Sequence, residues 1–232
     1  MQNKWWAKVL RIIGITFMSL TAAFTIMGGV GTACVAINPT GYGNSLAPIA
    51  KAQLLYIIFV IVTTFIGVMG ARAVVLLVKG SRNAYRFGLI TLVSGIVLNG
   101  IHMAVSRSLR GSSMPVDMVE YTTLLTLIIF LIFRIPSIWK GVNFEKNVDD
   151  KKAGTIAMAI ALWVAGFLTL AIPFLMAPTH TISEINYSNV WHTILTIIGI
   201  GLILAGVIEL FSLERITYKT KSLPLVDINR QT

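Results

Sequence analysis

The sequence predicts an all-α, polytopic membrane protein, a bundle of six transmembrane helices with both termini in the cytoplasm. Of its 232 residues, 56% are hydrophobic and only 12% are charged. Six apolar segments each reach the roughly 20 residues that an α-helix needs to cross the hydrocarbon core of a bilayer. The residue alternation of a membrane β-barrel is absent, so helices are the way left to pair backbone groups in lipid.

The expected helices cover residues 9–36, 53–78, 87–106, 118–139, 153–177 and 189–213. They form one transmembrane domain over residues 1–215, followed by a cytoplasmic tail over residues 216–232. The first apolar segment, which follows basic residues and ends near Cys34, resembles a signal peptide, but it is long for one and we expect it to stay as the first helix. Because Cys34 is the only cysteine, a disulfide framework within the chain is excluded.

The orientation follows from the distribution of basic residues. With a cytoplasmic N-terminus, 16 of the 19 lysines and arginines lie on or reach the inner side, and only Lys51, Arg107 and Arg110 lie outside. This asymmetry is the positive-inside rule of a plasma (inner) membrane protein. It accounts for the net charge of +10 through attraction to anionic lipid headgroups on the cytoplasmic side, so nucleic acid is not needed as a partner.

Three of the expected helices carry a face of small and polar residues. The third helix has such residues at helical spacing, and the first and sixth helices repeat the pattern. These faces comprise Gly88, Thr91, Gly95, Asn99, His102 and Ser106; Thr21, Thr25, Gly28 and Thr32; and His192, Thr196, Gly199, Gly206 and Glu209. Small residues let helices approach closely in lipid, so we expect the first, third and sixth helices to meet. Plain packing explains such faces as well as a ligand site does.

The three histidines, His102, His180 and His192, all fall on the expected outer side. If the third and sixth helices face each other, His102 and His192 lie at similar depth. Two facing imidazoles are what a b-type haem or a transition metal requires, and His180 could complete a metal site. The alternative is that each histidine bonds a neighbouring backbone or hydroxyl group.

The segment 101–121 gathers a histidine, two arginines, an aspartate, a glutamate and four serines between two long apolar runs. Arg107 and Arg110 balance Asp117 and Glu120 in charge. A salt-bridge cluster that orders the turn is one interpretation, and such exposed pairs stabilise little. The other is an entrance that holds an anionic or zwitterionic ligand.

A second charged group lies toward the expected inner side. Arg72, Arg134 and Glu209 belong to the second, fourth and sixth helices. Ionisable groups within a membrane are costly and mark candidate ligand-binding or gating positions. Lysine and arginine can reach the interface with their long side chains, whereas a glutamate needs a partner, so we expect Glu209 to pair with Arg72 or Arg134.

The sequence leaves the specific function open and favours a non-catalytic role. The first interpretation is a small permease-like protein or an accessory subunit of a membrane complex, with membrane-protein partners or further copies of itself. The alternative is a redox subunit that holds haem or metal through His102 and His192. A third interpretation, an intramembrane enzyme using residues 102–121, lacks a diagnostic nucleophile–base spacing.

Overall fold

The computed structural model describes residues 5–41, 46–142, 144, 151–182, 185–186, 189 and 191–221. Its helices are α1 (Trp5–Ile37), η1, a 3-10 helix (Ala47–Ala52), α2 (Gln53–Lys79), α3 (Ala84–Arg110), α4 (Val116–Phe133), α5 (Pro136–Val142), α6 (Lys151–His180) and α7 (His192–Lys221). Between α6 and α7, β1 (Thr181–Ile182) pairs antiparallel with β2 (Ile185–Asn186). The two-residue strands are the only departure from an all-helical chain in the described part.

Six of these helices are long and apolar enough to cross a membrane, counting η1 and α2 as one span. They coincide with the six segments expected from hydropathy, which confirms a helical bundle compatible with a multi-pass membrane protein. Two boundaries differ by more than four residues. The fourth helix ends at Phe133 and not at residue 139. The last helix continues to Lys221, and residues 222–232 of the expected tail lie outside the described residues.

The early end of α4 follows from Pro136. A proline disfavours helical geometry at the residue before it and cannot donate a backbone hydrogen bond. The chain therefore turns at residues 134–135, and α5 begins with Pro136, where a proline is well tolerated. Trp139 and Lys140 consequently lie on this separate short helix and not on the membrane-spanning one.

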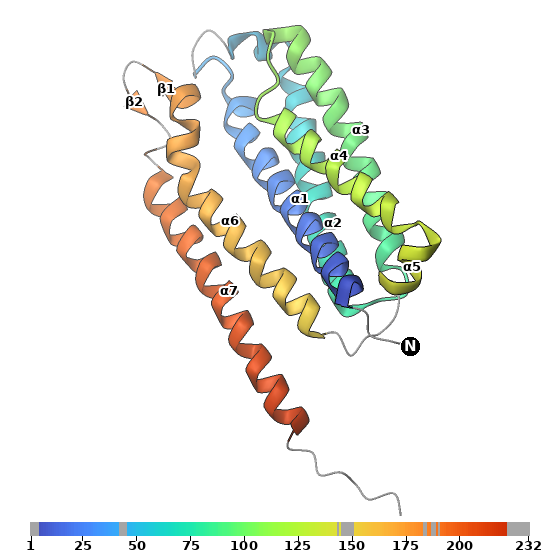
Figure 1. The fold of residues 1–232 in the computed structure, drawn as a ribbon. Helices are drawn as coiled ribbons and strands as arrows, with labels where there is room; N and C mark the ends of the chain where they lie inside the picture. Colours follow the sequence, from blue (N-terminus) through green and yellow to red (C-terminus); the bar gives the residue numbers. More distant parts are fainter. Residues whose placement is uncertain are drawn as a thin grey trace, which may run out of the picture.

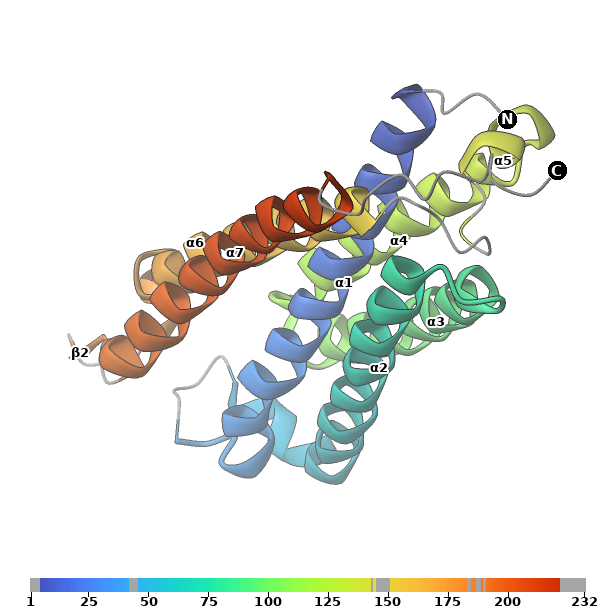
Figure 2. The same cartoon turned by 90° about the horizontal axis from the view of Figure 1, so that it is seen from below.

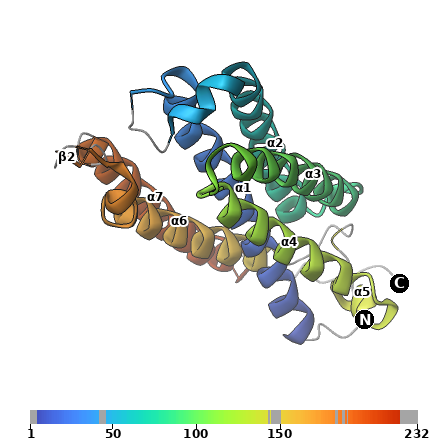
Figure 3. The same ribbon diagram turned by 90° about the horizontal axis from the view of Figure 1, so that it is seen from above.

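The helices form a four-helix bundle and a separate hairpin (Figure 1). Helices α1 to α4 make up the bundle, while α6 packs on α1 and α2 and α7 packs on α6. Views along the bundle show α6 and α7 together on the other side of α1 from α3 (Figures 2 and 3), and Figure 1 shows α7 as the outer of the two. Figure 1 also shows that α1 begins and α7 ends at the same end of the molecule, here named the terminal end. The opposite end, with η1 and the α3–α4 turn, is named the turn end.

Two glycines close the tight turns within the four-helix bundle. Gly80 has φ 66° and Gly111 has φ 70°, a left-handed conformation that other residues adopt at a cost. The amide of Gly80 donates to the Leu77 carbonyl oxygen, and the amide of Ser81 donates to that of Leu76. These bonds satisfy carbonyl groups at the end of α2 that the helix leaves unpaired. The turns let α2, α3 and α4 follow one another as antiparallel neighbours.

The terminal end of the bundle is filled by aromatic rings. Four of them, Tyr85, Phe130, Phe133 and Phe144, form the aromatic plug. The Tyr85 and Phe130 rings stack with centroids 5.7 Å apart, and Phe144 stacks on Phe130 at 6.0 Å. The Tyr85 hydroxyl donates to the Phe130 backbone oxygen, so the one polar group of the plug is satisfied. No plug residue is more than 1% exposed, and the plug closes this end of the bundle.

The expectation that the first, third and sixth helices pack against one another is wrong: α1 and α3 have α2 and α4 between them, and α7 lies outside the four-helix bundle. Among the described residues, α3 packs against α2, α4 and η1, while the only substantial packing of α7 is along α6. The small residues of α7 do mark a close contact, but with a different partner. A Cβ at Gly199 would lie 3.0 Å from the Gly166 oxygen of α6. The small-residue pattern shows where a helix can approach another one closely, but it does not identify the partner.

Candidate functional site

Two small cavities lie between α1, α2, α3 and α4, each of about 10 Å³. All four helices contribute to both. The histidine cavity is lined by Gly28, Gly29, Thr32, Phe59, Val60, Thr63, Asn99, His102, Val116 and Val119. The threonine cavity is lined by Met18, Thr21, Ala22, Thr25, Ile66, Gly70, Thr91, Leu92, Gly95 and Thr123. Each has room for about one water molecule.

The faces of α1 and α3 that the sequence singles out both line these cavities. All six residues of the α3 face are buried, as are the three threonines of the α1 face. The two helices make little direct contact, because α2 and α4 lie between them. Their polar faces therefore lie opposite each other across the centre of the bundle.

Glycines of α1 and α2 set the width of this region. A Cβ at Gly29 would lie 2.5 Å from the Thr64 hydroxyl oxygen, and one at Gly67 would lie 2.9 Å from the Ile26 backbone nitrogen. Such distances are far below van der Waals contact, so α1 and α2 approach as closely as they do only with glycine at these positions. Because the helices lie so close together, each cavity between them has room for no more than about one water molecule.

His102 is enclosed by aromatic side chains of α2. Its ring stacks on Phe59 with centroids 4.3 Å apart and meets the edge of Tyr56 at 5.2 Å. The residue is 3% exposed, and its Nε2 atom has no hydrogen-bonding partner among the described residues. Next to it, the Tyr56 and Ser106 hydroxyl groups share a hydrogen bond of 2.7 Å. His102 thus faces the interior of the four-helix bundle.

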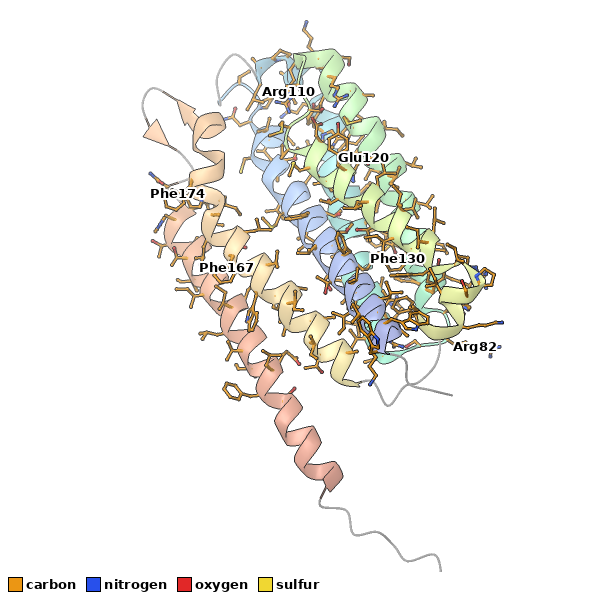
Figure 4. The ribbon with its side chains drawn as sticks, in the orientation of Figure 1. Arg82, Arg110, Glu120, Phe130, Phe167 and Phe174 are labelled. Carbon is orange, nitrogen blue, oxygen red and sulfur yellow. The ribbon has the colours of Figure 1, made fainter. Side chains whose placement is uncertain are left out.

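Asn99 and Glu120 are further buried polar residues with unpartnered atoms. Asn99 is 2% exposed and Glu120 is 8% exposed. The Asn99 Nδ2 and Glu120 Oε2 atoms have no partner in the part of the chain that the structure describes. Glu120 projects from α4 toward α3, where its Oε1 would lie 4.0 Å from a Cβ at Gly100. Figure 4 shows Glu120 deeper in the bundle than Arg110, on the way to Phe130.

Threonine hydroxyl groups continue this polar surface toward the threonine cavity. Thr25, Thr91 and Thr123 each donate to the carbonyl oxygen four residues earlier in their own helix, at 2.6–2.9 Å. Their donors are occupied, but their oxygen atoms can still accept hydrogen bonds. The Thr21 and Thr126 hydroxyl groups bond to each other at 2.7 Å. We name the buried polar side chains described above the polar seam: Tyr56, Ser106, His102, Asn99, Glu120, Thr25, Thr91, Thr123, Thr21 and Thr126.

The charged residues of the α3–α4 turn form a separate cluster. Arg107 Nε donates to the Ser113 hydroxyl at 2.8 Å and Arg107 Nη2 lies 3.5 Å from Asp117 Oδ2. Ser113 in turn donates to Asp117, and Arg110 donates to the Met114 backbone oxygen. Glu120, which the sequence groups with these residues, takes no part in the cluster. The cluster orders the turn and leaves Glu120 to the core.

The structure does not bring Arg72, Arg134 and Glu209 together. The Arg72 guanidinium lies over the Phe87 ring at 5.4 Å, and that of Arg134 lies over Trp139 at 5.3 Å. Glu209 lies on α7, which does not pack against α2 or α4. The expectation that Glu209 pairs with one of these arginines is therefore wrong. Each guanidinium makes a cation–π contact with an aromatic ring instead.

The two histidines proposed as paired ligands lie apart. His102 is buried against α2, whereas His192 is exposed at the start of α7. His180 ends α6, and its side chain lies outside the described residues. No group of three or more histidine, cysteine, aspartate or glutamate residues with metal-binding geometry occurs in the described part. A haem or metal site shared by His102 and His192 within one chain does not fit this arrangement, because their helices are not neighbours.

Sequence reasoning missed the contribution of α2. Tyr56, Phe59 and Thr63 surround His102, and they follow one another at spacings of three and four residues, continued by Gly67 and Gly70. The same criterion that identified the α3 face would have found this one. It was obscured because the remaining residues of α2 are almost all apolar, so the face contrasts little with the lipid-exposed side.

Comparison with known proteins adds no relative: no protein-family model, curated protein or solved structure matches the chain significantly. The described part of the molecule is a helical bundle compatible with a membrane protein, and polar side chains line the cavities among α1, α2, α3 and α4.

Proposed function

We propose that the chain is a non-catalytic, small permease-like protein that passes a small hydrophilic solute along the polar seam. The helices would lie in the plasma membrane with the terminal end in the cytoplasm, as the distribution of lysine and arginine favours. The solute would enter at the turn end, near Ser106 and Tyr56. The conducting path would lie within α1 to α4, and α6 and α7 would support it from outside.

One observation carries this proposal: polar side chains line two cavities inside the bundle, and Thr126, bonded to Thr21, lies one helical turn before Phe130 of the aromatic plug. Buried polar groups in a membrane are costly when they lack partners. A bundle held together by packing alone has no need of Asn99, His102 and Glu120 with unpartnered atoms in its interior. A path for a solute does need polar groups on one side of a closed gate.

The plug provides the test. Phe130 is fully buried and packs against Gly88, where a Cβ would lie 3.2 Å from its ring. Purified protein in liposomes should pass at least one of water, protons, ammonium, sodium or potassium ions faster than protein-free liposomes. Phe130→Ala should raise that rate, because it removes a ring from the closed end.

The matched control is Phe65→Ala, which removes the same ring from a lipid-facing position that is 62% exposed. Its transport rate should equal that of the unmodified protein. If none of these solutes passes faster than in protein-free liposomes, with or without Phe130, the permease function is refuted.

That outcome would favour an accessory subunit of a membrane complex. The observation behind this second candidate is the isolation of α7, whose most apolar stretch is only 11% buried and packs on α6 alone among the described helices. A membrane protein partner, or a second copy of the chain, would then lie against α7.

A further inference from the structure

The histidine cavity limits what the protein can bind. It measures about 10 Å³, which is the space of about one water molecule. An organic solute does not fit without a rearrangement of all four helices. The species held there is therefore of the size of water, an ion or a proton.

The side chains around this cavity complement a water molecule. Asn99 Nδ2 offers a hydrogen-bond donor, Thr63 Oγ1 a hydroxyl group, and His102 Nε2 a donor or an acceptor, and none of these atoms has a protein partner among the described residues. A buried water molecule needs two to four such partners. Glu120 does not line this cavity: its unpartnered Oε2 belongs to a side chain that reaches from α4 toward Gly100 of α3, next to Asn99 in the chain.

The same side chains are poor ligands for a metal or alkali ion. A hard cation takes about six oxygen ligands, whereas much of this wall is apolar, including Phe59, Val60, Val116 and Val119. The amide group of Asn99 that lacks a partner is a donor, and it would repel a cation. A transition metal would need further nitrogen, sulfur or carboxylate ligands beside His102. These groups suit hydrogen bonding and proton exchange better than coordination.

We infer that the species bound in the α1–α4 bundle is a proton associated with one water molecule, and that His102 and Glu120 are the side chains that take it up. Its role as transported solute rests on the permease function proposed above. On uptake, a buffer acid outside the protein gives up its proton and remains as the conjugate base. The proton forms an N–H bond at His102 Nε2 or an O–H bond at the Glu120 carboxylate, and no other bond breaks.

The polar seam offers a route for such a proton. The Tyr56–Ser106 hydrogen bond lies beside His102 toward the turn end. On the other side, hydroxyl groups of Thr25, Thr91 and Thr123 lie along the threonine cavity, which has room for a second water molecule. A hydroxyl group relays a proton by accepting one and donating its own, so each threonine passes a proton on only when its bond to the backbone oxygen is released. Such a relay does not need the wide pore that an ion with its hydration shell requires.

The other charged or titratable groups around the site are accounted for. Tyr56 of α2 shares its hydroxyl with Ser106, and Asp117 of α4 is paired with Arg107. Arg110 of α3 interacts electrostatically with His102 and donates to a backbone oxygen. Lys51 is exposed on η1, and the cavity wall on α1 consists of two glycines and Thr32. Among the described residues around the site, His102 Nε2 and Glu120 Oε2 lack a hydrogen-bonding partner, as does Nε of the otherwise bonded Arg110.

Proton binding is tested at equilibrium, independently of transport. Infrared difference spectra of the full chain in liposomes, recorded over a pH titration, report the C=O stretch of protonated carboxyl groups. Glu120→Gln should remove one such band, and His102→Gln should displace it. Glu209→Gln makes the same chemical change on α7 and should leave that band in place.

A second arm measures proton flux in the same liposomes, which Glu120→Gln and His102→Gln should abolish and Glu209→Gln should not. If Glu120→Gln and His102→Gln leave both the spectrum and the proton flux unchanged, the inference is overturned. Flux of another ion without these spectral changes also overturns it, while the permease function stands. A lost band without any flux supports the proton site and refutes the permease function. Because glutamine matches both side chains in polarity, size-exclusion profiles should confirm that the variants fold.

Discussion

Ser113 lies at the centre of the hydrogen bonds that hold the α3–α4 turn. It is 1% exposed, accepts a hydrogen bond from Arg107 and donates one to Asp117. An exposed ion pair alone contributes little because water and salt screen it. The buried hydroxyl gives the pair a fixed geometry, so the turn depends more on Ser113 than on either charge.

Ser113→Ala should lower the free energy of unfolding by about 1–3 kcal/mol, because it leaves a partly buried carboxylate without one of its donors. Thermal unfolding in detergent measures the effect as a lower melting temperature. Ser108→Ala is the matched control: Ser108 is exposed and donates only to the Val105 backbone oxygen of its own helix. Equal melting temperatures for the two variants would contradict the role given to Ser113.

The His102 side chain is held by aromatic contacts and not by a hydrogen bond at Nε2 among the described residues. Its stacking on Phe59 and its edge contact with Tyr56 hold the ring in one orientation. Aromatic contacts of this kind contribute about 0.5–1.5 kcal/mol beyond the area they bury. They keep Nε2 inside the bundle, where a protein partner is missing, and this combination distinguishes a site from an ordinary interfacial histidine.

At the scale of elements, the α6–α7 hairpin depends on two glycines that face each other. A Cβ at Gly166 would lie 2.8 Å from the Gly199 oxygen, and one at Gly199 would lie 2.7 Å from the Leu170 side chain. Lipid provides no hydrophobic force between helices, so close packing of small residues is the main source of their association. Since α7 has no other substantial neighbour among the described helices, this contact holds it in place.

Gly199→Leu should therefore separate α7 from α6 and lower stability by about 1–3 kcal/mol, the usual effect of overpacking. Gly201→Leu tests the same substitution two residues away, where an added Cβ would meet nothing within 4 Å. Thermal unfolding of the two variants in the same detergent should show a loss only for Gly199→Leu. An equal loss of stability for Gly201→Leu would show that a leucine destabilises α7 at either position, so that the contact between α6 and α7 is not the cause.

At the scale of the whole molecule, six spans place the start of α1 and the end of α7 at the same end. Arg82 and Arg110 mark the two ends of the bundle in Figure 4. Among the residues that the structure describes, most lysines and arginines belong to the half of the bundle at the terminal end, and the turn end carries Lys51, Arg107 and Arg110. The positive-inside rule then predicts that the terminal end faces the cytoplasm.

Cysteine labelling tests this orientation in a Cys34→Ser background, since Cys34 is exposed. A cysteine at Ser112, exposed in the α3–α4 turn, should react with a membrane-impermeant maleimide added to intact cells. A cysteine at Asn83, exposed in the α2–α3 turn, should react only after the cells are permeabilised. The reverse pattern would invert the orientation and place the histidine cavity near the inner surface.

The sequence by itself determined the six helices and the polar face of α3. Both are local properties: hydropathy over about 20 residues makes a span, and spacings of three and four residues align side chains on one face. Pro136 was likewise recognisable as a break, because proline interrupts a helix whatever surrounds it. These features hold for any arrangement of the helices.

Only the tertiary structure decided which faces meet. Gly199 marks a close contact on α7, but a small residue is equally suited to any neighbouring helix, and the partner proved to be α6. For this reason His192 lies away from His102, and Glu209 away from Arg72 and Arg134. Which helix lies beside a polar face depends on the packing of all six together, and it is this packing that buries Asn99, His102 and Glu120 within the four-helix bundle.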